Sequence, residues 1–234
     1  MHVTAIELPA RWGAPREALA EVDAWLARGP ATELVLLPEA ALTGYVSPEG
    51  DFDASVFAED VDGPTAQALA ALAARHRVHL VAPLVERAGD ACFNSMVGFG
   101  PSGARTFVYR KRHPWIPETW ATPGDGAHPL VTIGDRTVTI ATCFDLHFLP
   151  DEAADVLAAA DLLLFPSAWV DRRHTRLPLL RALAARFDVA VVNANWAPGV
   201  VRLAGQGGSC VLARDGAVVA TATPASRRAD ASLP

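Results

Sequence analysis

The chain has 234 residues, of which 51% are hydrophobic, and its formal net charge at pH 7 is −6. A chain of this size buries about 70 to 75% of its extended surface on folding, which is enough for one large core. The negative charge argues against binding to nucleic acid or to an anionic membrane, because both need a basic face on the protein. We therefore expect one domain that binds a small molecule, with no nucleic-acid partner and no membrane partner.

The N-terminus and the cysteines predict a cytoplasmic protein without disulfides. His2 and Glu7 stand where a secretory signal would be basic and then apolar, and no apolar run reaches the roughly 18 residues that cross a bilayer. Cys92, Cys143 and Cys210 are far apart and include no close pair of the kind that binds zinc or forms a redox dithiol. We expect Cys92 and Cys210 to be small buried apolar residues.

The first part of the chain alternates strands with helices. Residues 3–8 and 33–38 are predicted strands, and the second is a continuous apolar run, as in a strand covered on both faces. Residues 15–28 place apolar side chains at helical spacing behind a proline and before a glycine. A second predicted helix over residues 64–77 leads directly to a strand over residues 78–86. These helix-then-strand steps predict parallel pairing.

The middle of the chain has a different pattern, in which short strands are separated by turn sequences. The turns GD, PSG and GDR suit hairpins, so the strands they join are predicted to pair antiparallel. These strands cover residues 92–100, 105–110, 129–133 and 136–142.

The last part of the chain returns to alternation and then ends in a polar segment. We expect helices over residues 150–160 and 174–187, and strands over residues 161–167, 188–195, 207–213 and 217–222. The mixture of crossovers and hairpins predicts an α/β layered domain with more than one sheet. A single domain is expected over residues 1–222, followed by a flexible C-terminal tail over residues 223–234, which is rich in Ser, Arg, Ala and Asp.

Three ionisable residues follow predicted strands, where reactive groups of α/β sheets usually lie. Glu39 follows LVLLP, Lys111 follows RTFVYR, and Cys143 follows TVTIAT. If the strand ends converge, the carboxylate can take the thiol proton and the ammonium can neutralise the oxyanion of a tetrahedral adduct. An ammonium and a following helix start would also favour the thiolate. Taken singly, each residue is more often a surface charge or a buried spacer.

The segments around these residues resemble motifs of the nitrilase or carbon-nitrogen hydrolase superfamily. LLPEAALTGY is similar to its glutamate motif, YRKRHPWIPETWATPGD to its lysine motif, and TIATCFDLHFLPDE to its cysteine motif. The motifs come in the family's order and rough spacing, and the resemblance extends from the first strand to about residue 222.

The resemblance implies a fold, a set of catalytic roles and an assembly. The fold is a four-layer α-β-β-α sandwich with two mixed β-sheets, commonly paired into a homodimer. Glu39 would be the general base, Lys111 the transition-state stabiliser and Cys143 the nucleophile, with no metal and no organic cofactor. Glu118 would hold Lys111 and position substrate or water, and the backbone N–H of Phe144 would complete the oxyanion hole. Homodimerisation is less secure than in the family, because the sequence stops soon after its last predicted hairpin.

The substrate pocket is expected to consist of side chains near the three strand ends. The candidates for substrate binding are Tyr45, Trp115, Phe144, His147, Trp169 and Arg173, and further residues considered for the pocket are Trp120, Arg172, His174 and Trp196. If Arg172 or Arg173 points inward, a carboxylate-bearing substrate is favoured; the alternative is a surface arginine pair. His147 is expected either to contact substrate or to cap the turn after the nucleophile.

The expected activity is hydrolysis of a small amide or carbamoyl compound through a thioester on Cys143, with release of ammonia or an amine. Nitrile hydrolysis, acyl transfer by the same residues and a catalytically silent binding protein on this fold stay open as alternatives. A serine hydrolase is disfavoured, because Ser209 lacks the G-x-S-x-G elbow and begins a strand. GQGG is not followed by a helix, which argues against a dinucleotide site.

Overall fold

The computed structural model describes residues 1–198 and 205–234, and its centre is a pair of six-stranded sheets. The first sheet contains, in spatial order, β12 (Arg228–Ser232), β1 (His2–Ile6), β2 (Leu34–Leu36), β3 (His79–Ala88), β4 (Ala91–Phe99) and β5 (Arg105–Arg110). The second contains β11 (Val218–Thr221), β10 (Cys210–Leu212), β9 (Ala190–Ala194), β8 (Leu162–Pro166), β7 (Arg136–Ile140) and β6 (Val131–Ile133).

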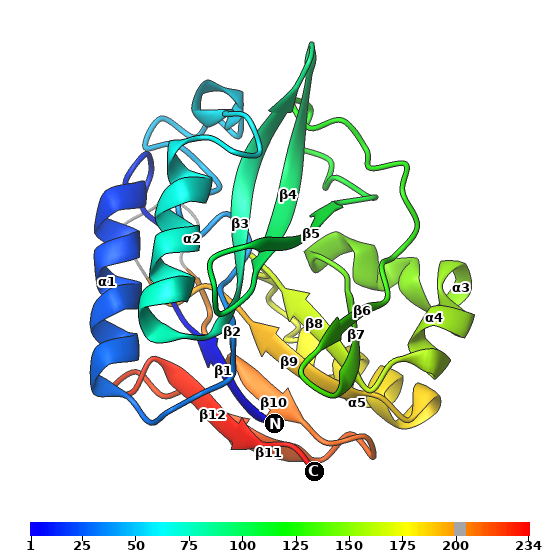
Figure 1. Ribbon diagram of the computed structural model, residues 1–234. Helices are drawn as coiled ribbons and strands as arrows, with labels where there is room; N and C mark the ends of the chain where they lie inside the picture. The colour runs from blue at the N-terminus through cyan, green and yellow to red at the C-terminus, as the bar shows by residue number, and fades with distance from the viewer. Residues whose placement is uncertain (199–204) are drawn as a thin grey trace.

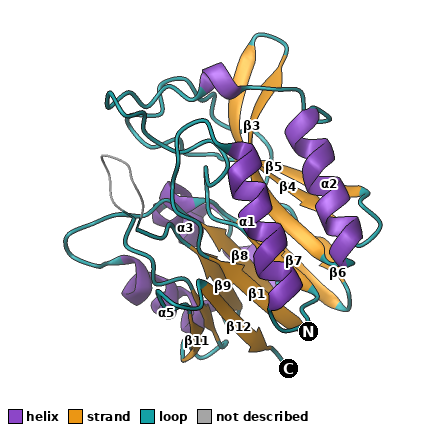
Figure 2. Cartoon of the chain, turned by 90° about the vertical axis from the view of Figure 1, so that its left-hand side faces the viewer, coloured by secondary structure: helices purple, strands orange, loops and turns teal. Residues whose placement is uncertain are grey.

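Helices cover the outer face of each sheet (Figures 1 and 2). The first sheet carries α1 (Pro15–Arg28) and α2 (Pro64–His76), and the second carries α3 (Leu149–Glu152), α4 (Ala154–Ala159) and α5 (Arg176–Phe187). Two short 3-10 helices complete the described elements, η1 (Ser55–Phe57) and η2 (Cys143–His147). Among the residues described, no helix has both the length and the apolar character needed to span a membrane.

The core is divided into three apolar layers, which explains the continuous hydrophobic runs of the strands. Leu36 and Met96 of the first sheet face Ile140 and Leu164 of the second across the middle layer. The outer layers pack helix side chains against the opposite face of each sheet, such as Leu69 on the first sheet. Because a strand between two apolar layers is buried on both faces, it needs no polar alternation. The predicted four-layer α-β-β-α sandwich is confirmed.

Strand pairing follows the predicted pattern and sets the geometry of the site. β1, β2 and β3 are parallel, as are β7, β8 and β9, while β3, β4 and β5 form an antiparallel meander. In the β4–β5 ladder Ser95 lies opposite Arg110, and the next backbone hydrogen bond joins the N–H of Lys111 to the carbonyl of Asn94 at 2.8 Å. Asn94 and Lys111 are therefore cross-strand neighbours.

The structure contradicts the prediction of a flexible tail. Residues 228–232 form β12, which pairs antiparallel with β1 and covers its outer edge, as the adjacent chain ends in Figure 1 show. Arg228 is only 5% exposed and donates to the carbonyl of Trp25 at 2.7 Å and to Asp230 at 2.6 Å. Polar composition suggested disorder, but pairing of the β1 edge and the bonds of Arg228 order the segment.

The structure also corrects the helix predicted over residues 150–160. The segment is broken at Ala153, whose backbone (φ −135°, ψ 30°) is not helical, so that α3 and α4 are separate short helices. Leu149 and Leu157 both face the second sheet. The break lets both short helices bury their apolar side chains on this sheet.

Candidate active site

The ends of β2, β5 and β7 bring Glu39, Lys111 and Cys143 into one cluster, in which the charged side chains are buried and Cys143 is partly exposed. The ammonium nitrogen of Lys111 lies 2.7 Å from Oε1 of Glu39 and 2.6 Å from Oε2 of Glu118. Lys111 is 1% exposed, Glu39 0% and Glu118 2%. The thiol of Cys143 lies near enough to the Glu39 carboxylate that each group shifts the pKa of the other. The sequence-predicted convergence of these residues is therefore observed.

Cys143 stands on a sharp turn between β7 and η2. Its φ of +47° is in the left-handed region, which a residue with a side chain adopts only when its surroundings hold it there. Those surroundings include the buried carboxylate of Asp145, which accepts the N–H of Thr142 at 2.9 Å and the hydroxyl of Tyr109 at 2.7 Å. Because Tyr109 belongs to β5, this bond ties the turn to the strand that carries Lys111.

Burial and charge determine the protonation of the cluster. Burial raises the pKa of the Cys143 thiol well above its usual value, and the Glu39 carboxylate raises it further, although Lys111 opposes both. These effects favour the neutral thiol at Cys143. Burial also raises the pKa of the Glu39 carboxyl, although Lys111 opposes this shift. Burial lowers the pKa of Lys111, but Glu39 and Glu118 outweigh it, so that the net shift is upward and the amine stays charged.

Two buried side chains hold Glu39 in place: Asn94, which was not predicted from the sequence, and Trp196, which was predicted to lie in the pocket. Nδ2 of Asn94 lies 2.9 Å from Oε1 of Glu39 and 2.6 Å from Oε1 of Glu118. The indole N–H of Trp196 donates to the backbone carbonyl of Glu39 at 2.8 Å. Asn94 could have been found only from the β4–β5 register, and Trp196 lies 157 residues from Glu39 in the chain, so neither carries a local signal.

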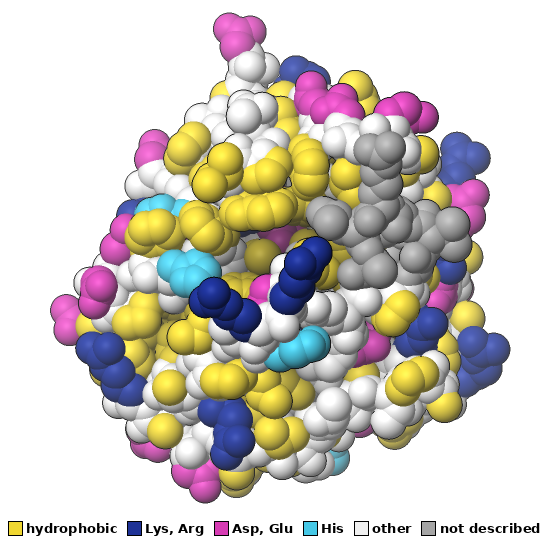
Figure 3. All heavy atoms as spheres, turned by 180° about the vertical axis from the view of Figure 1, so that it is seen from behind, with side chains coloured by type: hydrophobic (Ala, Val, Ile, Leu, Met, Phe, Trp, Pro, Cys, Tyr) yellow, Lys and Arg dark blue, Asp and Glu magenta, His cyan; other side chains and the backbone are white. Residues whose placement is uncertain are grey.

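A pocket of about 260 Å³ opens over the cysteine. Cys143 lies in its wall together with five aromatic side chains, Tyr45, Trp115, Phe144, His147 and Trp169. On the face shown in Figure 3, hydrophobic side chains surround a hollow and basic side chains lie at its rim. The five predicted aromatic and histidine contacts thus line one cavity, whose wall is mainly apolar.

Asp171 organises the loop that forms one side of this pocket. Its Oδ2 accepts the indole N–H of Trp169 and, at 3.1 Å, the hydroxyl of Thr175, while its Oδ1 accepts the backbone N–H of Arg173 at 2.7 Å. The carboxylate therefore holds the loop in a tight turn. The indole of Trp169, 5.3 Å from the His147 ring, is fixed as part of the wall.

Several side chains considered for the pocket lie elsewhere. Arg172, Arg173 and His174 are exposed, and none of them is among the described residues that line the cavity over Cys143. Arg173, a predicted substrate contact, is therefore outside the described lining because the turn around Asp171 leaves this segment exposed, and its contact with substrate stays a prediction. Trp196 is fully buried beneath Glu39.

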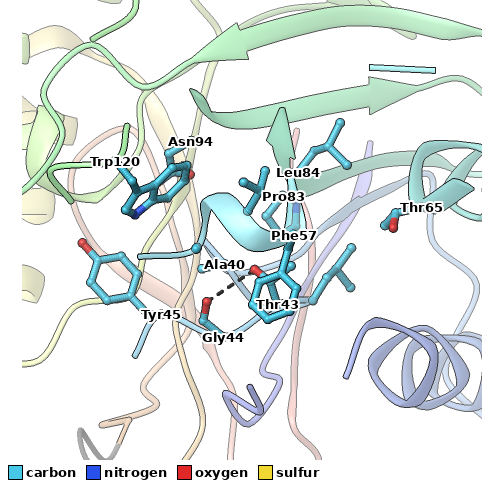
Figure 4. Close-up of a pocket in the computed structure, with 13 residues that line it drawn as sticks. Ala40, Thr43, Gly44, Tyr45, Phe57, Thr65, Pro83, Leu84, Asn94 and Trp120 are labelled. Atoms are coloured by element: carbon cyan, nitrogen blue, oxygen red, sulfur yellow. Dashed lines mark hydrogen bonds between the residues drawn. The ribbon is translucent and has the colours of Figure 1, made fainter. Parts of the chain in front are cut away.

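Trp120 lines a second, much smaller cavity of about 20 Å³. Tyr45, Trp120 and Asn94 lie together at one end of it and Thr65 lies at the other (Figure 4). Its volume is about that of a single water molecule. Of these two cavities beside the cluster, the pocket over Cys143 is the one with room for a substrate. In the described part of the chain, no group of three or more His, Cys, Asp and Glu side chains is placed to hold a metal ion.

Comparison with known proteins agrees with this architecture. The sequence profile described as carbon-nitrogen hydrolase matches residues 3–228. A protein of Pseudomonas protegens named hydrolase in pqqF 5'region is 28% identical over 194 residues, which cover 81% of this chain and 67% of that protein. A nitrilase of Pyrococcus abyssi is 31% identical over 154 residues, which cover 64% of this chain and 58% of that protein. The match therefore spans only part of each of these curated relatives.

Solved structures of an amidase from Nesterenkonia sp. superpose on the whole chain. One crystal structure has a TM-score of 0.90 at 25% identity and covers 100% of this chain and 90% of the other. A glutamate-to-glutamine mutant of that amidase carries the acetamide moiety of fluoroacetamide covalently added at its active-site cysteine, with a TM-score of 0.89, 25% identity and the same coverage. Fold and sequence profile agree over nearly the full length, and the chain belongs to the carbon-nitrogen hydrolase family.

Proposed function

We propose that this protein is an amidase-type hydrolase that cleaves a small uncharged amide through a covalent thioester on Cys143. One observation carries the proposal: a buried ammonium is bonded to two carboxylates, and one of these carboxylates also faces a thiol in the wall of a mainly apolar pocket. This arrangement supports roles for the thiol as nucleophile, the carboxylate as base and the ammonium as electrostatic stabiliser. The amidase from Nesterenkonia, with its adduct on a cysteine, supports the same chemistry.

The first half of the reaction forms the thioester. Oε2 of Glu39 takes the thiol proton as the sulfur of Cys143 attacks the carbonyl carbon. The carbonyl oxygen becomes an oxyanion, which the ammonium of Lys111 and the backbone N–H of Phe144 stabilise. Glu39 then delivers the proton to the amide nitrogen, the C–N bond breaks, and ammonia leaves. The acyl group remains on sulfur, and Glu39 is again ionised.

The second half hydrolyses the thioester. Glu39 takes a proton from a water molecule as the water oxygen attacks the thioester carbon, and the same two donors stabilise the second oxyanion. The C–S bond breaks, the sulfur recovers a proton from Glu39, and a carboxylic acid is released. Lys111 stays charged throughout, since both carboxylates hold its proton. Glu118 has the role of fixing Lys111 and does not exchange a proton with the substrate.

The pocket wall supports an uncharged acyl part. Most of the lining consists of aromatic and small apolar side chains, and the carboxylate of Asp171 is already bonded to Trp169, Thr175 and the backbone. A charged acyl group would lose hydration against this lining, in which the described residues include no Lys or Arg. The apolar wall does not favour a nitrile over an amide. We propose the amide, because an amidase is among the structural relatives that cover this whole chain.

The experiment compares wild-type protein with Cys143→Ala and with Cys92→Ala, a buried cysteine outside the pocket, as the matched control. Ammonia release is measured from small aliphatic and aromatic amides, carbamoyl compounds and nitriles. We expect release from neutral amides by the wild type and the control and none by Cys143→Ala. Intact-protein mass spectrometry should place the acyl adduct on Cys143. Turnover by Cys143→Ala, or an adduct on Cys92 or Cys210, would contradict the mechanism.

Folded wild-type protein that neither releases ammonia nor forms an adduct with any of these compounds would favour the silent binding protein. Adding hydroxylamine and measuring hydroxamate separates acyl transfer from hydrolysis. The homodimer and the cytoplasmic location stay predictions. The molar mass in solution, from light scattering, tests the first.

A further inference from the structure

A single buried amide joins the two carboxylates of the cluster. Asn94 is 6% exposed, and its Nδ2 is within hydrogen-bonding distance of both Glu39 and Glu118, at 2.9 and 2.6 Å. Because a carboxamide nitrogen carries two hydrogens, each carboxylate can receive one. Asn94 also accepts the backbone N–H of Lys111 across the β4–β5 ladder. The residue thus contacts all three charged residues of the cluster, Glu39, Glu118 and Lys111.

The charge balance of the cluster explains why such an amide matters. Two carboxylates share one ammonium in a buried site, so that their mutual repulsion disfavours ionisation of both. Hydrogen bonds donated to a carboxylate favour its charged form. An amide supplies these bonds without adding a charge that would compete with Lys111.

The hydrogen bonds to Glu39 differ between its two carboxylate oxygens. Oε1 accepts from both Lys111 and Asn94, whereas Oε2 accepts the backbone N–H of Ala168 at 2.9 Å. With Oε1 held by two donors, the carboxylate cannot turn without breaking them. Oε2 is left as the oxygen with capacity for one more hydrogen, and the Cys143 thiol is the group that can supply it.

We propose that Asn94 is a positioning residue for the reaction, which keeps Glu39 and Glu118 ionised together and holds Oε2 of Glu39 ready to accept the thiol proton. The inference rests on the proposed function for the identity of the base. It adds a member to the site that acts only through the two carboxylates and does not touch the substrate.

The pH dependence of the site tests this role, and the groups that set it come from several elements. The titratable groups facing Glu39 are Lys111 and Glu118 after β5, Cys143 at the start of η2 and Tyr45 after β2. Lys111 and Tyr45 both have pKa values shifted upward, so neither changes charge near neutral pH. The rise of kcat/KM on the acidic side of the pH profile, its acidic limb, therefore reports the first proton lost from the coupled carboxylates and thiol.

The main variant is Asn94→Leu, which has a similar volume and no donor. We expect the acidic limb of kcat/KM for a neutral amide to move to higher pH by about one unit or more, since two hydrogen bonds to charged groups are lost. Asn94→Ser keeps one hydroxyl donor and should give a smaller shift in the same direction, which covers the case that Asn94→Leu does not fold.

The matched control is Ser95→Ala, on the same strand. Ser95 is fully buried and donates to Glu86 at 2.6 Å, so its loss removes a buried hydrogen bond away from the cluster. A purely structural role for Asn94 predicts that all three variants lose stability and that none moves the limb. An acidic limb that coincides with the wild type in both Asn94 variants would overturn the proposal.

Alkylation of Cys143 by iodoacetamide gives a second readout that needs no turnover. Its rate against pH should show the same upward displacement in Asn94→Leu and Asn94→Ser and none in Ser95→Ala. If the wild type hydrolyses no amide but the alkylation profile moves, the proposed function fails and the positioning role stands. If amides are hydrolysed and neither profile moves, the positioning role fails and the proposed function stands.

Discussion

The buried charge cluster and the aromatic wall of the pocket meet at Cys143 but are built in opposite ways. Glu39, Lys111 and Glu118 are at most 2% exposed, and strand ends and a cross-strand amide hold them. The wall consists of side chains on loops and on η2, which contact one another through rings, as Tyr45 and Trp115 do with centroids 6.1 Å apart. The sheets thus position the reactive side chains, whereas the pocket wall is formed by segments that can vary without disturbing the fold.

A link exists between the two regions. The backbone N–H of Trp115 donates to Oε2 of Glu118, the oxygen that also accepts from Lys111. The phenol of Tyr45 lies beside Glu118 as well, and burial followed by the charge of Glu118 raises the pKa of Tyr45 well above its usual value. Trp115 and Tyr45 thus connect the wall to the cluster. Elsewhere, changes in the cluster should affect the rate of the chemical step, and changes in the wall should affect mainly the KM.

The largest effect is expected from Lys111→Met, which leaves two buried carboxylates without their cation. We expect kcat to fall by about a thousandfold, since an oxyanion donor is lost. The free energy of unfolding should fall by about 3 to 5 kcal/mol, because one partner of a buried ion pair has been removed. Amide turnover and urea unfolding measure the two effects.

A second substitution in the same protein sharpens this test. Lys111→Met combined with Glu118→Gln removes the surplus negative charge, so stability should recover in part while turnover stays absent. Retention of kcat within about tenfold of the wild type by Lys111→Met would break the assignment of Lys111 as the stabiliser.

A smaller effect, on binding, is expected from Trp169→Ala in the wall. Loss of an apolar contact with the acyl group should raise KM about tenfold or more, since burial of a large apolar side chain contributes about 1.5 to 3 kcal/mol. The value of kcat should stay within a few-fold of the wild type. Steady-state kinetics with a series of aliphatic amides of increasing length measures both constants.

The matched control for this wall variant is Trp25→Ala on α1, a tryptophan that does not line the pocket. It should change neither constant. If Trp169→Ala instead lowered kcat and left KM alone, the separation between a catalytic cluster and a selecting wall would not hold.

The smallest effect is expected from replacing Arg172 and Arg173 together with alanine. Both are exposed and outside the lining of the pocket, and exposed charges are screened within about 10 Å at ordinary ionic strength. The KM for a neutral amide should stay within about twofold of the wild type. A parallel assay with an amide that carries a carboxylate tests the alternative: selective loss of that substrate would show that the arginines bind it.

Local sequence patterns predicted much of the fold and the positions of the reacting groups. The parallel and hairpin-linked pairings, and the positions of Glu39, Lys111 and Cys143 after their strands, follow from apolar runs, turn residues and three motifs. The flexible tail predicted from composition was wrong at residues 228–232, because a strand at a sheet edge is ordered by its neighbour, here β1. The exposure of Arg173 could not be predicted locally, because it depends on the turn held by Asp171.

The sequence by itself determined which chemical groups are available and which strand ends carry them, since hydrophobic periodicity and local turns depend on near neighbours in the chain. Only the tertiary structure decided that the Asn94 amide lies opposite Lys111, that Trp196 anchors Glu39, and that burial favours the neutral thiol at Cys143. Strand register, burial and distances between charges arise from segments far apart in the chain. The proton positions that govern the reaction depend on these long-range contacts.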